Sequence, residues 1–332
     1  DHRDLHSFPT RRSSDLILRD QQFCNLSEVV VRSEDTIQDL EEKVRIATIL
    51  GTLQATLTDF KYLNPQWRIN TEEEALLGVS LTGIMDHPIL NGGEKWIVDK
   101  RNGNIYRLPD LLTHLKNIAI EVNKELAAKL GINQAAAISC VKPSGTVSQL
   151  VNSASGIHPR HSQYYIRTVR ADNLDPLCQM MKDIGIPWEP DKWASGSTTV
   201  FSFPIKSPEN AVFRDNISAI DQLNHWLVYQ RYWCEHKPSI TVNVKDHEWL
   251  EVGAWIYEHF DEVSGISCLP HSEHIYEQAP YQDITEEEYI ELESKMPKNI
   301  DWSILSNYEK VDNTKSTQTY ACTGNVCEIV DL

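Results

Sequence analysis

The stretch FCNLSEVVV at residues 23–31, with DTIQDLEEKVRIATILGTLQATLTDF at residues 35–60 after it, decides the fold class. The first segment ends in a run of β-branched residues, which favours a strand. The second has an acidic first turn and apolar residues at helical spacing, which predicts a helix. After a predicted helix start at Asn70 and Thr71, the strand-like segment GVSLTGIM follows at residues 78–85. Strands and helices in this order are typical of α/β architecture with parallel strands.

The alternation continues along most of the chain. A helix is predicted at residues 109–130, with Pro109 near its first turn and Gly131 just beyond its end. Further strands are predicted at residues 136–141, 164–170, 198–203, 239–244 and 265–269. Further helices are predicted at residues 175–184, 218–235, 246–260 and 285–296. This pattern indicates parallel strands arranged as a barrel or as an open sheet.

Three regions of the chain differ in character. Residues 1–16, DHRDLHSFPTRRSSDL, are basic and polar without an apolar period. They resemble a translated sequencing adapter, so we exclude them from the fold and expect the natural chain to begin well upstream. Residues 17–300 are predicted to form a packed catalytic body. Residues 301–332 are predicted to be a flexible tail, because the stretch 306–321 is polar and lacks an apolar period.

Composition limits the classes of function. The chain has 332 residues, 41% of them hydrophobic, and a formal net charge of −17. Such a charge argues against nucleic-acid binding, which depends on neutralising phosphates. No apolar run approaches a membrane span and no signal peptide is visible, so a soluble cytoplasmic protein without membrane contact is expected. The seven cysteines are scattered except for the last two, which fits a reducing compartment better than a disulfide framework.

The segment CVKPSGTVSQL at residues 140–150 is a candidate phosphate-binding loop. Its glycine lets a ligand approach the backbone, its hydroxyls stand beside amide groups at a predicted helix start, and Lys142 adds positive charge. The candidate residues are Ser144, Gly145, Thr146 and Ser148. The spacing of a Walker motif is absent. An ordinary strand-to-helix turn with a Ser or Thr cap explains the same residues equally well.

The next segment, SASGIHPRHSQYYIRTVR at residues 153–170, is the most basic part of the chain. It could form a second wall that faces phosphate, or its arginines could simply face solvent on one side of a strand. The residues concerned are His158, Arg160, His161, Arg167 and Arg170.

The thiols at the two ends of the chain form the third candidate. Cys24 stands at the start of a predicted strand, where a lone cysteine is usually a small buried hydrophobe. Cys322 and Cys327 lie in a polar tail that offers no core to bury them. Four residues between them allow a disulfide to close, and a flexible arm could then carry electrons to an external reductant. Zinc is the alternative, although two cysteines supply half of a structural site.

Six segments resemble those of the adenosylcobalamin-dependent ribonucleoside-triphosphate reductases, the class II ribonucleotide reductases. They follow one another in the order FCNLSEVVVR, GVSLTGIMD, KPSGTVSQLVNSASGIHPRHSQYYIRTVR, PSITVNV, APYQDI and CTGNVCEI. The resemblance covers residues 17–332. It implies the second half of a ten-stranded α/β barrel, with the N-terminal half of the enzyme absent.

In that family, adenosylcobalamin generates a thiyl radical that removes hydrogen from the ribose of a ribonucleoside triphosphate. The resemblance implies that Cys24 is one of two cysteines that reduce the 2′ carbon, with its partner in the absent half. It implies that Cys322 and Cys327 are a mobile pair that restores those cysteines and is itself reduced by thioredoxin. It also implies that the substrate phosphates bind to Ser144, Gly145, Thr146 and Ser148.

The chain departs from the family at the radical cysteine. The family places this cysteine in an N-P-C-x-E-I motif about eleven residues before the position of Cys24, and that register falls on Arg11, Ser13 and Asp15. A serine O–H bond is much stronger than a thiol S–H bond, so we expect this chain to be inactive on its own. No D-x-H-x-x-G cobalamin motif is present, and this family does not require one.

Two other functions remain compatible with these residues. A diphosphate-using or metal-cofactor reductase would share the phosphate loop and the tail thiols, although the C-x4-C ending and the KPSGTVS segment fit the triphosphate type best. A nucleotide-binding thiol-redox protein without radical chemistry would also need only a phosphate loop and a dithiol.

Overall fold

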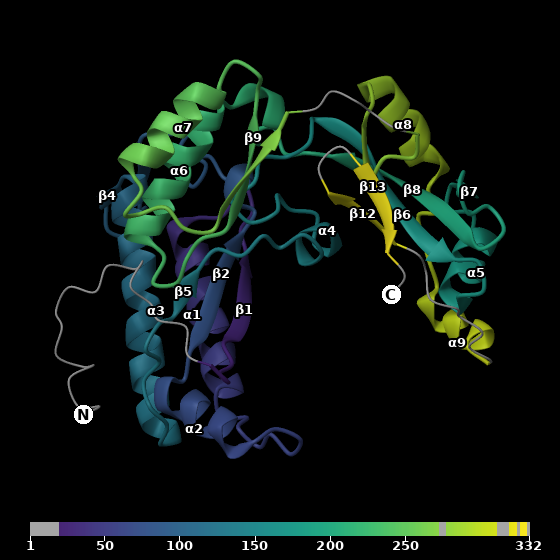
Figure 1. The fold of residues 1–332 in the computed structure, drawn as a ribbon. Helices are drawn as coiled ribbons and strands as arrows, with labels where there is room; N and C mark the ends of the chain where they lie inside the picture. The colour runs from purple at the N-terminus through teal and green to yellow at the C-terminus, as the bar shows by residue number, and fades with distance from the viewer. Residues whose placement is uncertain (1–19, 272–276, 311–318, 324–325, 331–332) are drawn as a thin grey trace. The chain divides into compact units, whose positions relative to one another are not determined.

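The computed structural model describes residues 20–271, 277–310, 319–323 and 326–330, the last two segments by their backbone alone. The chain divides into two compact units (Figure 1). Unit 1 contains the described residues up to Arg160 together with Asn210–Leu269, and unit 2 contains His161–Glu209 and the described residues from Pro270 onward. The predicted adapter-like segment lies outside the described residues. The predicted boundary near residue 300 stays a prediction.

Unit 1 alternates strands and helices as the sequence pattern indicates. Its strands are β1 (Asn25–Val30), β2 (Leu77–Thr82), β3 (Ile97–Val98), β4 (Ile105–Tyr106), β5 (Ser139–Cys140), β9 (Ile240–Val244) and β10 (Ile266–Pro270). Its helices are α1 (Ile37–Gln54), α2 (Pro65–Glu74), α3 (Leu108–Leu130), α4 (Val147–Leu150), α6 (Ala219–Tyr232) and α7 (Trp249–Glu258).

Local signals explain where these helices begin and end. Thr36 caps α1 in a capping box with Asp39, in which the backbone N–H of each residue donates to a side-chain oxygen of the other. Gly131 ends α3 with φ 70°, a conformation that glycine adopts without strain. The predicted helix start at Asn70 and Thr71 is wrong: these residues lie inside α2, which begins earlier, behind the cap of Asn64 and the proline that follows it.

The central sheet of unit 1 is parallel, as predicted. β2 lies between β1 and β5, and the register pairs Asn25 with Leu77 and Ser80 with Cys140. β9 and β10 form a second pair of strands. The Ser239 N–H, just before β9, donates to the carbonyl of Val141, just after β5. The described residues contain sheets of two to four strands and no closed barrel. The predicted half of a ten-stranded barrel is therefore not confirmed.

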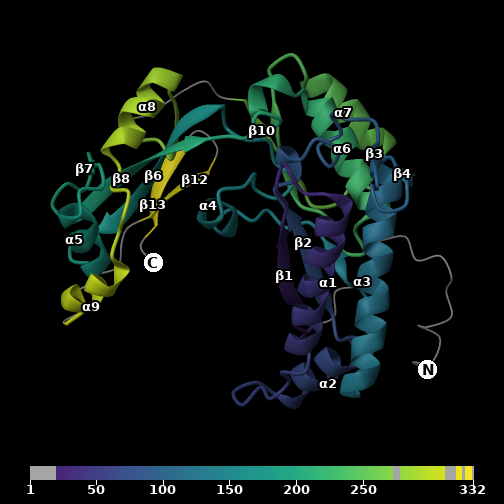
Figure 2. The ribbon, with the colours of Figure 1, turned by 180° about the vertical axis from the view of Figure 1, so that it is seen from behind.

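The main hydrophobic core lies between this sheet and its helices. α1 and α3 run side by side along one face of the sheet (Figures 1 and 2). Leu40 of α1, Leu111 of α3 and Leu77 of β2 are fully buried in this layer. α6 packs against α3, β9 and α7 and adds the buried side chains of Trp226 and Tyr229. Burial of these apolar side chains supplies most of the stability of unit 1.

Unit 2 is built on an antiparallel sheet. The strand order is β11 (Tyr281–Asp283), β6 (Tyr164–Asp172), β8 (Thr198–Lys206) and β7 (Trp188–Pro190). The helices of this unit are α5 (Pro176–Asp183), α8 (Glu286–Lys295) and the short α9 (Leu305–Tyr308). β6 and β8 were predicted at the right places but as parallel strands, and β7 and β11 were not predicted. Their alternation of side chains carries no information on direction, which is set by how the chain returns.

The tail contains a hairpin of two antiparallel strands, β12 (Thr319–Thr323) and β13 (Val326–Val330). Its register places Cys322 directly opposite Cys327.

Candidate functional site

The two faces of the parallel sheet differ in chemistry, because successive residues of a strand point to opposite sides. One face is apolar and covered by α1: a Cβ on Gly51 of this helix would lie 3.5 Å from Leu77 Cδ2. This face also carries the buried residues Val29, Val79 and Leu81, with Ser27 as its polar member. On the opposite face β2 contributes only small and polar residues, Gly78, Ser80 and Thr82, and β1 contributes Leu26, Glu28 and Val30. We call this opposite face the polar face.

Two thiols approach Gly78 on the polar face, and so does the side chain of Leu26, whose Cδ2 would collide with a Cβ on this glycine. The sulfur atoms of Cys24 and Cys140 lie 3.3 Å and 3.4 Å from the position that a Cβ on Gly78 would occupy. Cys24 is exposed and Cys140 is buried. Burial raises the pKa of Cys140 to about 12. Desolvation also raises the pKa of Cys24, and the nearby Lys142 ammonium partly offsets this. Both groups are therefore thiols rather than thiolates at neutral pH.

The polar face continues into the candidate phosphate loop. The backbone N–H of Lys142 donates to the hydroxyl of Ser80 at 2.9 Å, which joins the start of the loop to β2. Glu28 of β1 is half-buried, and its desolvation raises its pKa. The Ser144 hydroxyl lies near enough to lower this pKa in turn, without a hydrogen bond between the two groups. Cys24 and the first residues of the loop therefore belong to one site.

The four predicted loop residues are brought together but are not equivalent. Gly145 and Thr146 are exposed, and Ser144 is half-buried with φ 53°, an uncommon conformation for a side-chain-bearing residue. Ser148 is fully buried, and its Oγ lies 2.7 Å from Oγ of Ser155. The helix predicted after the loop is α4, which has only four residues. Any phosphate would therefore meet loop amides and hydroxyls rather than the end of a long helix.

The basic segment 153–170 does not form a single wall. Arg160 is buried against Asp86 in unit 1. Arg170 forms an ion pair with Asp191 in unit 2, 2.9 Å between Nε and Oδ2. Arg167, also in unit 2, lies over the ring of Tyr281 at 4.6 Å from the ring centroid. The three arginines, which the sequence suggested as phosphate ligands, therefore already interact with groups of the protein.

His158 joins the end of this region to β9. Its Nε2 accepts a hydrogen bond from the N–H of Thr241 at 2.9 Å, so its Nδ1 carries the proton and donates to the carbonyl of Ser155 at 2.8 Å. Burial lowers the pKa of His158, which keeps the ring neutral. This histidine has a structural role.

The side chains of Cys322 and Cys327 lie outside the described part of the structure, and so do Arg11, Ser13 and Asp15. The strand register alone places the two cysteines opposite each other. Among the residues that the structure describes, no group of three or more His, Cys, Asp or Glu side chains could hold a metal ion. Within the same residues, no helix has the length and apolar character of a membrane span.

Sequence reasoning missed three members of the site. Glu28 could have been found, because it lies four residues after Cys24 and alternation along a strand puts both on one face. Gly78 and Cys140 carry no such signal, since only the pairing of β2 with both neighbours brings them to Cys24.

Comparison with known proteins connects the chain to one group of enzymes. No protein-family model matches the chain. An adenosylcobalamin-dependent ribonucleoside-triphosphate reductase of Lactobacillus delbrueckii subsp. bulgaricus is 24% identical over 341 residues, which is 96% of this chain and 45% of that protein. The enzyme of the same name from Euglena gracilis is 25% identical, over 98% of this chain and 43% of its own length.

A solved structure shares the fold. The crystal structure of a B12-dependent, class II ribonucleotide reductase matches with a TM-score of 0.73 and 23% sequence identity, over 90% of this chain and 44% of that one. The chain thus spans less than half the length of the relatives that it matches. Over nearly all of its own length the chain is similar to adenosylcobalamin-dependent ribonucleoside-triphosphate reductases, and it shares the fold of the matching part of a class II ribonucleotide reductase.

Proposed function

We propose that this chain is part of an enzyme that reduces ribonucleoside triphosphates to 2′-deoxyribonucleoside triphosphates, with adenosylcobalamin as cofactor. The observation that carries the proposal is the polar face, on which the Cys24 thiol and the start of the phosphate loop lie together through Gly78, Ser80 and Lys142. A ribonucleotide reductase needs this combination, because the ribose must reach the thiols while its phosphates are held nearby.

The relatives are named adenosylcobalamin-dependent, and we extend the cofactor to the complete enzyme. When bound, the cofactor supplies the radical through cleavage of its cobalt–carbon bond. The protonated state of Cys24 fits a thiol that gives up hydrogen, and does not fit a ligand to cobalt. We assign none of the described residues to cofactor binding.

Cys24 is proposed to act as one of two reducing cysteines. Two thiols give two hydrogen atoms and become a disulfide, while the 2′-hydroxyl of the ribose leaves as water and hydrogen takes its place. The relatives' second cysteine is proposed to lie in the part of those proteins that this chain does not span. Ser144, Gly145, Thr146 and Ser148 are proposed to hold the phosphates, the first three by contact and Ser148 from beneath the loop.

Cys322 and Cys327 are proposed to return electrons to that disulfide. Residues directly opposite each other in an antiparallel pair have Cα atoms about 4.5–5.5 Å apart, which lies within the range that a disulfide spans. Thioredoxin is the proposed external reductant. We expect this chain alone to lack turnover, because Ser13 stands where the family's radical cysteine is expected.

Nucleotide binding tests the proposal. Isothermal titration calorimetry should show that the chain binds a ribonucleoside triphosphate more tightly than the corresponding diphosphate. Replacing Gly145 by Val should lower the affinity for the triphosphate by about tenfold, because a side chain there blocks the approach of phosphate to the loop amides. Replacing exposed Gly253 of α7 by Val is the matched control, because Gly253, like Gly145, has no positive φ and no atom within 4 Å of an added Cβ. Equal affinity for both nucleotides would favour a diphosphate reductase, and no binding would contradict the proposed site.

A nucleotide-binding thiol-redox protein without radical chemistry remains the second candidate. The pair of protonated thiols at Gly78 is the observation that favours it, because it needs nothing outside this chain. Turnover of ribonucleotides by a longer form of the protein would exclude it.

A further inference from the structure

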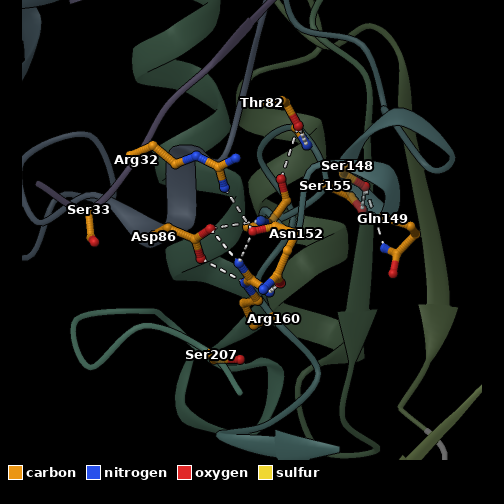
Figure 3. Close-up of polar contacts among 12 residues, drawn as sticks. Arg32, Ser33, Thr82, Asp86, Ser148, Gln149, Asn152, Ser155, Arg160 and Ser207 are labelled. Atoms are coloured by element: carbon orange, nitrogen blue, oxygen red, sulfur yellow. Dashed lines mark hydrogen bonds and ion pairs between the residues drawn. The ribbon is translucent and has the colours of Figure 1, made fainter. Parts of the chain in front are cut away.

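A buried ion pair lies beneath the candidate phosphate loop. Arg160 donates from Nε to Asp86 Oδ1 at 2.8 Å and from an NH2 nitrogen to Asp86 Oδ2 at 2.8 Å (Figure 3). The two side chains are 3% and 4% exposed. A guanidinium and a carboxylate held by two parallel hydrogen bonds have a fixed mutual orientation. The two side chains therefore hold each other in a fixed position, and neither charged group faces solvent.

The same arginine also fixes Asn152. It donates to the side-chain oxygen of Asn152 at 3.0 Å and to its backbone carbonyl at 3.1 Å. Arg32, at the end of β1, donates to the same carbonyl at 3.0 Å (Figure 3). Asn152 has φ 47°, a left-handed conformation that costs energy for a residue with a side chain. Three hydrogen bonds from two arginines hold it there.

Asp86 and Thr82, the last residue of β2, form hydrogen bonds with the backbone of the residues after Asn152. Asp86 Oδ2 also accepts from the N–H of Ala154 at 2.8 Å. The hydroxyl of Thr82 donates to the carbonyl of Ala154 at 3.0 Å and accepts from the N–H of Gly156 at 2.9 Å. Residues 152–156 are thus fixed to the carboxyl end of the central strand.

The loop rests on this fixed segment. The N–H of Ser153 donates to the carbonyl of Ser148 at 2.9 Å, and the hydroxyls of Ser148 and Ser155 are hydrogen-bonded. Gly156, with φ 55°, lies so close to the carbonyl of Lys142 that a Cβ would collide with it. Both ends of the loop, residues 142 and 148, therefore contact the segment that Asp86 and Arg160 hold.

We propose that Asp86, Arg160 and Asn152 form a clamp of positioning residues, which sets the shape of the phosphate loop without touching phosphate. The inference rests on the proposed function of that loop. Arg160, which the sequence offers as a phosphate ligand, acts instead through Asn152 and Ala154. The clamp adds rigidity to a loop whose exposed residues, Gly145 and Thr146, have few contacts of their own, and binding sites depend on such support.

Hydrogen exchange and ligand binding on the same protein test the clamp. The amides of residues 148–150 are the readout, because each donates to a carbonyl within the loop and none bonds directly to Asp86 or Arg160. In Arg160→Gln these amides should exchange at least tenfold faster, whereas those of β1 and β2 keep their wild-type rates. The affinity for inorganic tripolyphosphate, measured by calorimetry, should fall by about tenfold.

Three variants separate positioning from general loss of stability. Arg160→Lys keeps the charge but cannot form both hydrogen bonds to Asp86 and reach Asn152, so intermediate effects are expected. This variant decides the outcome if Arg160→Gln does not fold. Asn123→Ala breaks a buried hydrogen-bond network of α3 in the same unit, and Arg170→Gln breaks the ion pair of unit 2. Neither should change loop exchange relative to β1 and β2.

The possible results lead to distinct conclusions. Wild-type exchange of the loop in both Arg160 variants would overturn the clamp, and so would equally fast loop exchange in Asn123→Ala. Unchanged tripolyphosphate affinity together with faster exchange would overturn its role in binding. A wild-type chain that binds no tripolyphosphate would instead overturn the phosphate function of the loop, while exchange would still decide whether the clamp shapes it.

Discussion

Two glycines of the candidate site are required because neighbouring groups lie close to their backbone. Gly78 accommodates two thiols, and Gly156 accommodates the carbonyl of Lys142. In both cases a side chain would displace neighbouring groups. Sequence patterns identified the polar residues of the loop, Ser144 and Thr146, but they could not identify these two glycines, because each is required by a segment distant in the sequence.

Replacing Gly156 by Ala should destabilise unit 1 strongly. The φ of 55° costs about 1–2 kcal/mol for alanine, and the collision with the Lys142 carbonyl adds to this. Gly103→Ala is the control, since Gly103 has φ 76° but no neighbour within 4 Å, so it should show the backbone cost alone. Urea denaturation gives both free energies of unfolding. Equal losses of unfolding free energy in the two variants would show that the Lys142 carbonyl moves away from the new methyl group without cost.

A second prediction concerns pH and His225 of α6. Desolvation of the partly buried ring lowers the pKa of His225 from 6.5 to about 4. The unfolded chain therefore takes up a proton at higher pH than the folded chain, so the contribution to stability is complete above pH 6.5 and is lost as pH falls towards 4. Between pH 7 and pH 5 unit 1 should lose about 2 kcal/mol from this group.

The variant His225→Phe tests this assignment. It keeps a ring against Tyr229, which the histidine contacts edge to face at 5.1 Å between centroids, and it removes the titration. The slope of unfolding free energy against pH should become flatter. His247→Gln, at an exposed position, is the control. An unchanged slope in His225→Phe would assign the acid sensitivity to other buried groups.

At the scale of elements, the helices followed their local signals more closely than the strands did. α3 begins and ends where Pro109 and Gly131 predicted, and α1 begins close to its predicted start but ends at Gln54, before the predicted residue 60. β6 and β8 were located correctly but pair antiparallel. A helix satisfies its backbone hydrogen bonds within one segment, whereas a strand depends on a partner that its own residues do not specify.

The hairpin of β12 and β13 makes the redox proposal testable on this chain. After mild oxidation, mass spectrometry of peptides should find a disulfide between Cys322 and Cys327, because the register places them opposite each other. Thioredoxin should reduce it. Cys322→Ser should abolish the thioredoxin-dependent step, and Cys178→Ser, which removes a buried thiol of unit 2, should not. Pairing of either cysteine with Cys24 instead would contradict a hairpin disulfide.

At the scale of the whole molecule, the two units differ in how much apolar surface they bury. Unit 1 has an extensive core that includes Trp226, Trp233 and many buried leucine, isoleucine and valine side chains. The core cluster of unit 2, in the described residues, has three fully buried members, Cys178, Ile186 and Phe201. Because stability grows with buried apolar area, unit 2 is expected to be the weaker of the two.

Hydrogen exchange at increasing urea concentration checks this difference. The amides of β6 and β8 should lose protection at a lower urea concentration than those of β1 and β2. Phe201→Leu should shift only the first transition, and Leu77→Ala should shift only the second. Coincident loss of protection in all four strands would show that the chain unfolds as one cooperative body.

The sequence by itself determined the α/β character, the position of most helices and strands, the candidate phosphate loop and the two groups of thiols. These features depend on periodicity, caps and short motifs, which are local. Tertiary structure decided the direction of the unit 2 strands and the burial of Arg160 against Asp86. It also decided the meeting of Cys24 with Cys140 over Gly78. Each of these depends on contacts between residues that are dozens of positions apart, and only the packed chain brings them together.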